Sequence, residues 1–227
     1  MTDPPIESLP RPMEVVLVDA NVLYSRVLCD YLLYAAEIGV CAVAWSQKIL
    51  DETTEHLCAN LPGFTAESAA RLTGALLEAF PYSLVEPSTA DNQRLEDWPL
   101  PDEDDRHAIA AALTAEATII CTNNTRDFPG QVMDPLGIAV MTPDALLARL
   151  VESHPAPMLR AHRMSVAAFR GATDAVTLAA LRRAGAAVAA DRLLDLLTTP
   201  EPGAFAAARR RDEVSGRLCS ENGLPGR

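Results

Sequence analysis

Acidic residues occur at four points of this 227-residue chain where the flanking sequence could bring them together. Asp19 ends the apolar run EVVLVD, and Asp127 follows shortly after the apolar run ATIICT. Asp105 is the last of four consecutive acids in PDEDDRHAIAAAL, and Glu52 lies in ILDETTEHL. Carboxylate oxygens are hard ligands that suit Mg²⁺ or Mn²⁺ and not zinc. A site made of these side chains would bind a divalent ion, which can assist displacement at phosphorus.

The electrostatic cost of bringing four carboxylates together also points to a bound divalent ion. Two unit charges about 5 Å apart repel by roughly 3 kcal/mol at an effective dielectric constant near 20. Protonation would relieve this repulsion by raising the pKa of one or two of the carboxyls. A divalent cation would neutralise all four. A cluster of these acids therefore indicates a metal site, or acids with perturbed pKa values.

The elements that must position these acids follow from the hydrophobic pattern. Short apolar runs, typical of buried parallel strands, alternate with segments of helical character. This alternation predicts an α/β fold in which a parallel sheet is flanked by helices on both faces. Ligands bind beyond the carboxyl ends of such strands, which is where Asp19 and Asp127 fall. The expected strands are residues 14–19, 40–45, 82–86, 117–122 and 137–142.

The remaining pattern predicts helices and divides the chain into three parts. From about Pro155 onward Ala and Arg dominate and strand patterns are absent, which predicts a small all-α C-terminal region. We therefore expect a flexible N-terminal arm (1–13), an α/β domain (14–153) and a helical C-terminal region (154–227). The expected helices span 25–38, 46–60, 66–79 and 103–116, one that opens at Thr142-Pro143, and then 157–170, 173–184, 187–198 and 205–218.

Charge and cysteine content exclude several classes of protein. The net charge is −12, with 8 basic and 23 acidic residues before position 150 and 11 basic and 8 acidic residues from there on. This distribution excludes a uniformly basic nucleic-acid-binding protein, but not an acidic body with an Arg-bearing tail. The five cysteines form no C-x-x-C pair, which argues against disulfides and structural zinc. Neither a membrane span nor a secretory signal is evident, so we expect a cytoplasmic protein without membrane association.

The segments that contain these acids resemble the PIN-domain family, and most closely the VapC-like toxins of bacterial type II toxin–antitoxin pairs. The resemblance covers about residues 14–150. It rests on four short motifs in the family's order, which are VDANVL, the acid in ILDE, DDRHAIAAAL and TNNTRDF. Each motif is weakly specific alone, but their order and spacing together are fairly specific. Some larger members of this toxin family also resemble the chain in having a helical C-terminal extension.

The resemblance implies a metal-dependent endoribonuclease that is restrained by a small cognate antitoxin protein. Metal-activated water would hydrolyse RNA phosphodiesters, with one or two Mg²⁺ or Mn²⁺ ions as the cofactor. The family's T-x-N-x-x-D-F pattern would place Thr122 and Asn124 in hydrogen bonds that support the fourth acid, and Asn21 would orient the first. The resemblance also suggests a homodimer. The metal-binding and catalytic quartet of the family would correspond to Asp19, Glu52, Asp105 and Asp127.

Neighbouring acids compete for two of these four positions. Successive helix residues point about 100° apart, so only one of Asp51 and Glu52 can face the site. The family's position favours Glu52. Asp105 matches the family's D-x(6)-A-L spacing, whereas Asp102 is interpreted as an N-cap or as a ligand that reaches the ion through water. The two acids between them are expected to be solvated charges favoured by the helix dipole, namely Glu103 and Asp104.

The sequence does not decide the roles of the basic and imidazole side chains beside these acids. Arg106 and Arg126 could contact the RNA backbone or could offset local negative charge, and both interpretations stay open. His107 is expected to be a surface or helix-packing histidine. The other histidines have no Cys or His partner at metal-ligand spacing, so no chemistry is assigned to them.

Other functions could use the same residues. One is a housekeeping PIN-type RNA-processing nuclease, and another is a non-catalytic regulator that binds a metal or a partner. A third is a phosphatase with an aspartyl nucleophile, a family with D-x-D-x-[TV] at the first strand. That hypothesis is disfavoured because Asn21 stands where the second Asp should be, and Lys48 is the only lysine in the chain.

Overall fold

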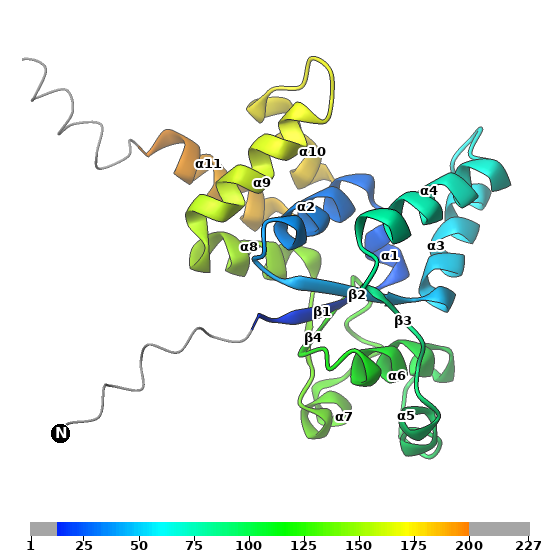
Figure 1. Ribbon diagram of the computed structural model, residues 1–227. Coiled ribbons are helices and arrows are strands. Elements are labelled where there is room, and N and C mark those ends of the chain that lie inside the picture. Colours follow the sequence, from blue (N-terminus) through cyan, green and yellow to red (C-terminus); the bar gives the residue numbers. More distant parts are fainter. Residues whose placement is uncertain (1–12, 200–227) are drawn as a thin grey trace, which may run out of the picture.

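A computed structural model describes residues 13–199 of the chain (Figure 1). Two of the sequence expectations fall largely or wholly outside this range. These are the N-terminal arm, of which residues 1–12 are not described, and the helix expected over 205–218. The described residues form a central sheet with helices packed on both of its faces.

The sheet has five strands and is parallel throughout. Its order is β3-β2-β1-β4-β5, so the chain builds outward from β1 in one direction and then returns to add β4 and β5 on the other side. This order creates a topological switch point between β1 and β4, where open α/β sheets bind ligands. The predicted α/β class is confirmed. The strands are β1 (Val15–Val18), β2 (Ala42–Ser46), β3 (Leu84–Val85), β4 (Ile119–Cys121) and β5 (Ala139–Met141).

Helices connect the strands and form the C-terminal region. The first group follows β1 and β2 and consists of α1 (Ala20–Leu23), α2 (Arg26–Glu37), α3 (Gln47–Asn60) and α4 (Ala66–Ala79). The second group consists of α5 (Thr89–Arg94), the 3-10 turn η2 (Glu103–Asp105), α6 (Arg106–Thr114), α7 (Gly130–Met133) and the 3-10 turn η3 (Asp134–Leu136). The C-terminal group consists of α8 (Pro143–Ser153), α9 (Pro155–Ala167), α10 (Asp174–Arg183) and α11 (Ala187–Thr198).

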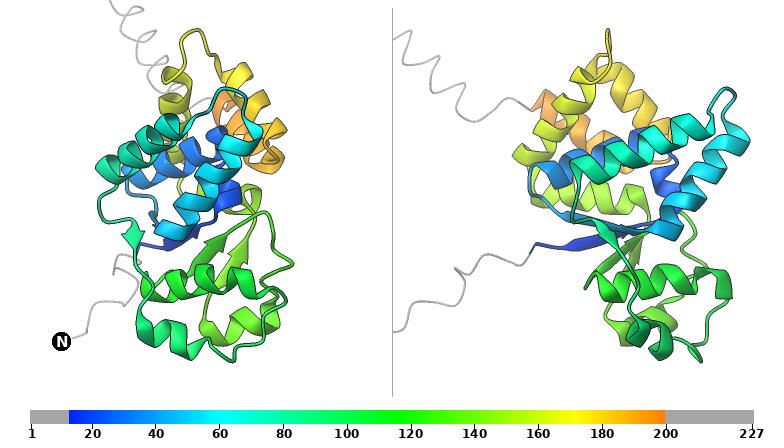
Figure 2. Two further views of the ribbon diagram at one scale, coloured as in Figure 1. Left: turned by 90° about the vertical axis from the view of Figure 1, so that its right-hand side faces the viewer. Right: turned by 45° about the vertical axis from the view of Figure 1, so that its right-hand side comes forward.

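The two faces of the sheet are covered by different groups of helices. In Figure 1, α1 to α4 and α8 to α11 lie on one side of the strands, and α5, α6 and α7 lie on the other. The two further views in Figure 2 show the same separation. The strands are therefore buried on both faces, which explains why β1 and β4 consist only of Val, Leu, Ile and Cys.

Polar caps fix where several helices begin, as their sequences predict. The Ser46 hydroxyl accepts a hydrogen bond from the Ile49 amide (3.3 Å) and starts α3 directly after β2. Thr65 and Thr142 cap α4 and α8 in the same way. An N-cap of this kind satisfies an amide that has no partner within the helix and contributes about 1 kcal/mol. The expected helix over residues 66–79 agrees with α4.

Three short helices were not expected from the sequence. They are α1, α5 and α7, which have four to six residues each. A helix of this length completes too few turns to display an apolar periodicity. The expected helix over 25–38 therefore corresponds to α2 alone, and the expected helix over 103–116 begins as the 3-10 turn η2 before it continues as α6.

The C-terminal helices share a hydrophobic core with the α/β part. Met158 on α9, Leu181 on α10 and Leu193 on α11 belong to the same buried cluster as Leu28 on α2 and Leu150 on α8. The core therefore extends across position 153, where we expected one domain to end.

Within residues 13–199, every helix is too short or too polar to span a membrane.

A buried polar contact joins α2 to this C-terminal layer. The Tyr31 hydroxyl lies 2.5 Å from His162 Nδ1, and His162 Nε2 lies 3.3 Å from an Asp174 oxygen. Tyr31 and His162 are both fully buried. Burial lowers the pKa of His162, which favours the neutral ring, although Asp174 opposes the shift. A neutral ring can donate from Nε2 to Asp174 and accept at Nδ1 from the Tyr31 hydroxyl.

Replacing Tyr31 by Phe should lower the free energy of unfolding by about 1–3 kcal/mol, because His162 Nδ1 would then be buried without a partner. Urea denaturation of the two proteins measures this difference. Tyr82→Phe is the matched control, because the Tyr82 side chain is 96% exposed and should tolerate the same change. Equal stability of Tyr31→Phe and the parent protein would show that this contact does not stabilise the packing of the C-terminal helices on α2.

Candidate active site

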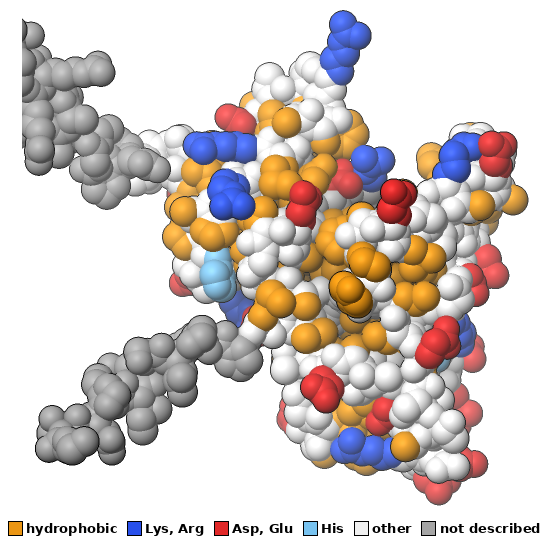
Figure 3. All heavy atoms as spheres, viewed as in Figure 1, with side chains coloured by type: hydrophobic (Ala, Val, Ile, Leu, Met, Phe, Trp, Pro, Cys, Tyr) orange, Lys and Arg blue, Asp and Glu red, His pale blue; other side chains and the backbone are white. Residues whose placement is uncertain are grey.

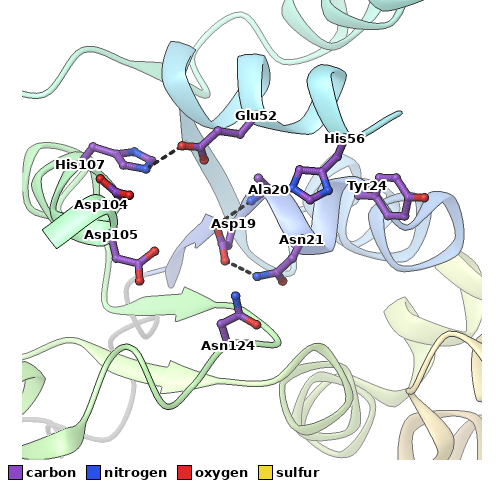
Figure 4. Close-up of a pocket in the computed structure, with 10 residues that line it drawn as sticks. All are labelled: Asp19, Ala20, Asn21, Tyr24, Glu52, His56, Asp104, Asp105, His107 and Asn124. Atoms are coloured by element: carbon purple, nitrogen blue, oxygen red, sulfur yellow. Dashed lines mark hydrogen bonds and ion pairs between the residues drawn. The ribbon is translucent and has the colours of Figure 1, made fainter. Parts of the chain in front are cut away.

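A pocket of about 390 Å³ opens at the switch point of the sheet (Figure 4). Its walls come from four separate parts of the chain, which are the β1–α1 junction, α3, the η2–α6 segment and the loop that follows β4. Three of the four predicted acids line it. The lining residues are Asp19, Ala20, Asn21, Tyr24, Glu52, His56, Asp104, Asp105, His107 and Asn124.

Asp19 is held rigidly at the centre of the pocket. It follows β1 directly and acts as the N-cap of α1, accepting a hydrogen bond from the Ala20 amide (2.7 Å). Its second oxygen accepts from the Thr122 hydroxyl (2.6 Å) and from the Asn21 side-chain amide. Burial raises the pKa of Asp19, while the hydrogen bonds from Thr122, Ala20 and Asn21 act in the opposite direction. Three polar groups therefore fix one partly desolvated carboxylate.

The register of β1 and β4 explains why Thr122 reaches Asp19. Val18 pairs with Cys121 in the parallel ladder, and the Asp19 amide donates to the Cys121 carbonyl (3.1 Å). The residues that follow these two strands are consequently neighbours, although they lie about a hundred positions apart. Parallel strands end at the same edge of a sheet, so both side chains reach the same place.

The predicted supporting residues form a network around Asp19. Asn21 donates to Asp19 and to the Thr122 hydroxyl (2.9 Å), and its carbonyl oxygen accepts from the Asn123 amide (2.9 Å). The Asn124 amide donates to the Thr122 hydroxyl (3.0 Å). We expected Thr122 to support Asp127, but its hydroxyl donates to Asp19. Only a backbone bond joins Asp127 to this network, from its amide to the Asn124 carbonyl (3.1 Å).

The pKa of Asp105 is affected by the charges of the other three predicted acids. Its pKa is raised to about 6, first by burial and then by Asp127, Asp19, Asp102 and Glu52 in that order. Asp127 is half-buried and does not line the pocket itself, but its charge acts on both Asp105 and Asp19. The four predicted acids therefore lie within one electrostatic environment, as the sequence analysis anticipates.

The acids around Asp105 differ in their surroundings. Asp102 accepts a hydrogen bond from the Asp104 amide (2.9 Å) and is the N-cap of η2, which was one of the two interpretations offered for it. Asp104 was expected to be only a solvated charge. Its side chain is exposed, but it also lines the pocket beside Asp105 (Figure 4).

Glu52, and not its neighbour Asp51, faces the pocket. Asp51 is exposed and accepts a hydrogen bond from the Gln47 side chain (2.8 Å). Glu52 Oε1 lies 3.2 Å from His107 Nε2 and 3.8 Å from Lys48 Nζ. Burial raises the pKa of Glu52, and Lys48 partly offsets this shift.

His107 is a part of the pocket wall that the sequence analysis did not assign to the site. Burial lowers its pKa to about 4, so its ring is neutral at pH 7. A neutral ring has one N–H group, and its contact with Glu52 places that proton on Nε2. Nδ1 is buried and has no hydrogen-bond partner among the described residues. His107 therefore lies against Glu52 as a neutral ring, and the two do not form an ion pair.

The two arginines flanking the acids have different environments. Arg106 is largely buried, lies 3.8 Å from Glu103 and donates to the Trp98 carbonyl (3.5 Å). These contacts favour a structural role in the loop before α6. Arg126 is exposed in the turn between Asn124 and Asp127. Of the two arginines, it is therefore the more accessible to a molecule that binds at the pocket.

The donor set of the pocket fits a hard divalent cation, although its side chains do not converge fully. Within residues 13–199, no three His, Cys, Asp or Glu side chains lie close enough together to ligate one ion. Mg²⁺ usually keeps several of its waters and binds through one or two carboxylates, so a looser set of acids suits it. The rigid carboxylate of Asp19 and the raised pKa of Asp105 are the features that favour such an ion.

Replacing Asp105 by Asn should stabilise the metal-free protein at pH 7. Because the pKa of Asp105 is raised from 3.8 to about 6, the fold is most stable with this carboxyl protonated. That stability is present below pH 4 and is lost as the pH rises through 6. After allowance for solvent screening of a partly exposed group, we expect a gain of about 1 kcal/mol at pH 7 and none below pH 4.

Urea denaturation in EDTA at the two pH values tests this expectation. Glu103→Gln is the control, because this neighbouring side chain is 88% exposed and should show no such pH-dependent gain. An Asp105→Asn protein that is less stable than the parent at pH 7 would contradict the conclusion that the buried charge of Asp105 and its repulsion by neighbouring acids destabilise the metal-free fold.

Fold and pocket together define a class of protein, namely a parallel α/β domain with an acidic pocket at its switch point. The comparison with family models agrees, since the model described as PIN domain matches residues 15–126. The matched segment includes Asp19, Glu52 and Asp105 and ends one residue before Asp127. The comparisons with curated proteins and with solved structures found no match.

Proposed function

We propose that this chain is a divalent-metal-dependent endoribonuclease of the PIN type. The main observation in support is that Asp19, Glu52 and Asp105 line one pocket, and that burial together with the neighbouring acids, Asp127 first among them, raises the pKa of Asp105 to about 6. The match of residues 15–126 to the PIN domain supports a nuclease in general. The sequence motifs support the narrower assignment to RNA.

The proposed cofactor is Mg²⁺ or Mn²⁺, and its ligands would come from Asp19, Glu52, Asp105 and Asp127. When bound, such an ion supplies an activated water molecule and offsets the negative charge that develops on a phosphodiester. An ion bound by one or two of these carboxylates, and reached by the others through water, would also offset their mutual repulsion.

The protein's own side chains keep these acids in place. Thr122, Asn21 and the Ala20 amide together fix both oxygens of Asp19. Glu52 Oε1 lies 3.2 Å from Nε2 of the neutral His107 ring, and this contact restrains the longer side chain of Glu52. With a pKa of about 6, Asp105 is mostly ionised at pH 7, and a bound cation would lower this pKa because only the carboxylate form is a ligand.

A protein partner is part of this proposal. By its motifs the chain is a VapC-like toxin that acts in the cytoplasm and is restrained by a small antitoxin. Figure 3 shows hydrophobic side chains gathered on the surface between α2 and α4, and exposed apolar patches often mark protein interfaces. This surface would suit an antitoxin or a second copy of the chain. A short upstream reading frame that encodes a DNA-binding protein would support the toxin role over a housekeeping one.

One observation favours a second candidate function. Because no three potential ligands converge within the described residues, the pocket could instead belong to a non-catalytic regulator that responds to a metal or to a partner. A nuclease assay separates the two candidates. The purified protein should cleave single-stranded RNA internally with Mg²⁺ or Mn²⁺, lose this activity in EDTA, and regain it when the ion is restored. Absence of cleavage with either ion would favour the regulator.

A further inference from the structure

Two aromatic side chains line the pocket beside the acids. Tyr24 follows α1 and His56 lies on α3, and their ring centroids are 6.1 Å apart with an angle of 72° between the ring planes. In Figure 4 they lie on one side of Asp19, whereas Asp104 and Asp105 lie on the other. The pocket therefore has an acidic side and an aromatic side that meet at Asp19.

Both aromatic rings are accessible. Tyr24 is 38% exposed, and His56 is exposed as well. His56 is four residues after Glu52, so the two side chains occupy the same face of α3 one turn apart. Two rings that meet nearly at right angles form a corner, in which a third flat group could stack on one ring while its edge meets the other.

The charge of the chain indicates what kind of group this corner would bind. With a net charge of −12 and acids on the facing wall, the site has little general attraction for a polyanion such as RNA. Base–aromatic stacking depends little on net charge and accepts any base, because every base has a π-face. The corner thus offers a neutral contact where electrostatic attraction is weak.

We propose that Tyr24 and His56 form a stacking site for an unpaired nucleobase of the nucleotide next to the cleaved phosphodiester. This inference rests on the proposed nuclease function and names the side chains that would hold a base of the RNA at the point of cleavage. A base in a duplex is already stacked and paired, so it cannot enter the corner without being displaced.

The simpler alternative is that the pair only packs α1 against α3. The chosen variants separate these roles, because packing depends on apolar volume whereas stacking depends on a flat ring. Tyr24→Phe keeps the ring, and Tyr24→Leu keeps much of the apolar volume without a ring. Tyr82→Leu is the matched control, since Tyr82 is almost fully exposed and does not line the pocket.

The test measures kcat and KM of the full chain with Mg²⁺ on a single-stranded oligoribonucleotide. We expect Tyr24→Leu to raise KM roughly 5- to 100-fold with little change in kcat, the range that loss of one stacked base implies. Tyr24→Phe and Tyr82→Leu should stay near the parent values. An abasic residue beside the cleaved bond should raise KM for the parent protein and should cause little further rise for Tyr24→Leu.

A parallel measurement of affinity keeps this inference distinct from the nuclease proposal. Fluorescence anisotropy with labelled RNA compares Asp19→Asn with the double variant Asp19→Asn/Tyr24→Leu. Cleavage that does not depend on Tyr24 would overturn the stacking site and leave the nuclease intact. Binding that depends on Tyr24 without cleavage by the parent would support the stacking site and overturn the nuclease. If RNA is neither bound nor cleaved, both proposals are overturned.

Discussion

Replacing Asp19 by Asn is expected to reduce RNA cleavage by roughly 10²–10⁴-fold. A bound metal contributes several kcal/mol of charge stabilisation in the transition state, and each 1.36 kcal/mol corresponds to a factor of ten in rate. Asn retains only one oxygen, which can accept either from the Ala20 amide or from Thr122 and Asn21, and it lacks the charge that would hold the ion. Burial raises the pKa of Asp19, so loss of the charge itself relieves a desolvation cost, whereas the new NH2 group faces hydrogen-bond donors, and circular dichroism is needed to check the fold of this variant.

Asp51→Asn is the matched control for this variant. It is the same chemical change one position before Glu52, on a side chain that is exposed and bonded to Gln47. Initial rates at saturating Mg²⁺ should be unchanged for Asp51→Asn and strongly reduced for Asp19→Asn, with identical circular dichroism spectra. Cleavage by Asp19→Asn at the parent rate would remove Asp19 from the mechanism and, with it, the proposed site.

Addition of Mg²⁺ is expected to raise the melting temperature of the parent protein. An ion at about 100 times its dissociation constant stabilises the folded state by about 2.7 kcal/mol. For a chain of this size, that corresponds to a rise of roughly 5–10 °C. Asp19→Asn and Asp105→Asn should show a much smaller rise, because each lacks one of the charges that the ion would neutralise.

Ionic strength must be matched in this experiment, since any salt screens the repulsion between partly exposed acids. Differential scanning calorimetry with NaCl at the same ionic strength supplies that comparison. A rise of equal size with NaCl, or in Asp19→Asn, would mean that Mg²⁺ acts by screening and does not occupy an ordered site.

The sequence predicted those parts of the fold that depend on local patterns. The apolar runs at β1 and β4, the helices expected over 46–60 and 66–79, and the change in composition near Pro155 each correspond to a feature of the structure. The short helices α1, α5 and α7 were missed because their formation depends on tertiary contacts and not on periodicity. The packing of α9 against α2 also depends on a contact that local patterns do not encode, since Tyr31 and His162 are 131 positions apart.

The candidate site was predictable to a similar degree. The motifs single out Asp19, Glu52 and Asp105, and the structure places all three on one pocket. The orientation of Thr122 toward Asp19 follows from the register between β1 and β4, which the sequence does not reveal. The contact between His107 and Glu52 was missed for the same reason, because it joins two helices that are remote in the chain.

The aromatic side of the pocket could have been found in part from spacing. His56 follows Glu52 by four residues, so a helix must present both on the same face. Tyr24 follows Asp19 by five residues and has no comparable signal, because the break between α1 and α2 determines its direction. The sequence therefore indicates one of the two rings, and the fold is needed to find the other.

Anomalous X-ray diffraction from crystals of the full chain grown with Mn²⁺ tests the central claim most directly. We expect a Mn²⁺ peak roughly 2.0–2.5 Å from an Asp19 carboxylate oxygen, with Glu52, Asp105 or Asp127 bound to it directly or through water. At saturating Mn²⁺, a peak at another place, or no peak in the pocket, would contradict it.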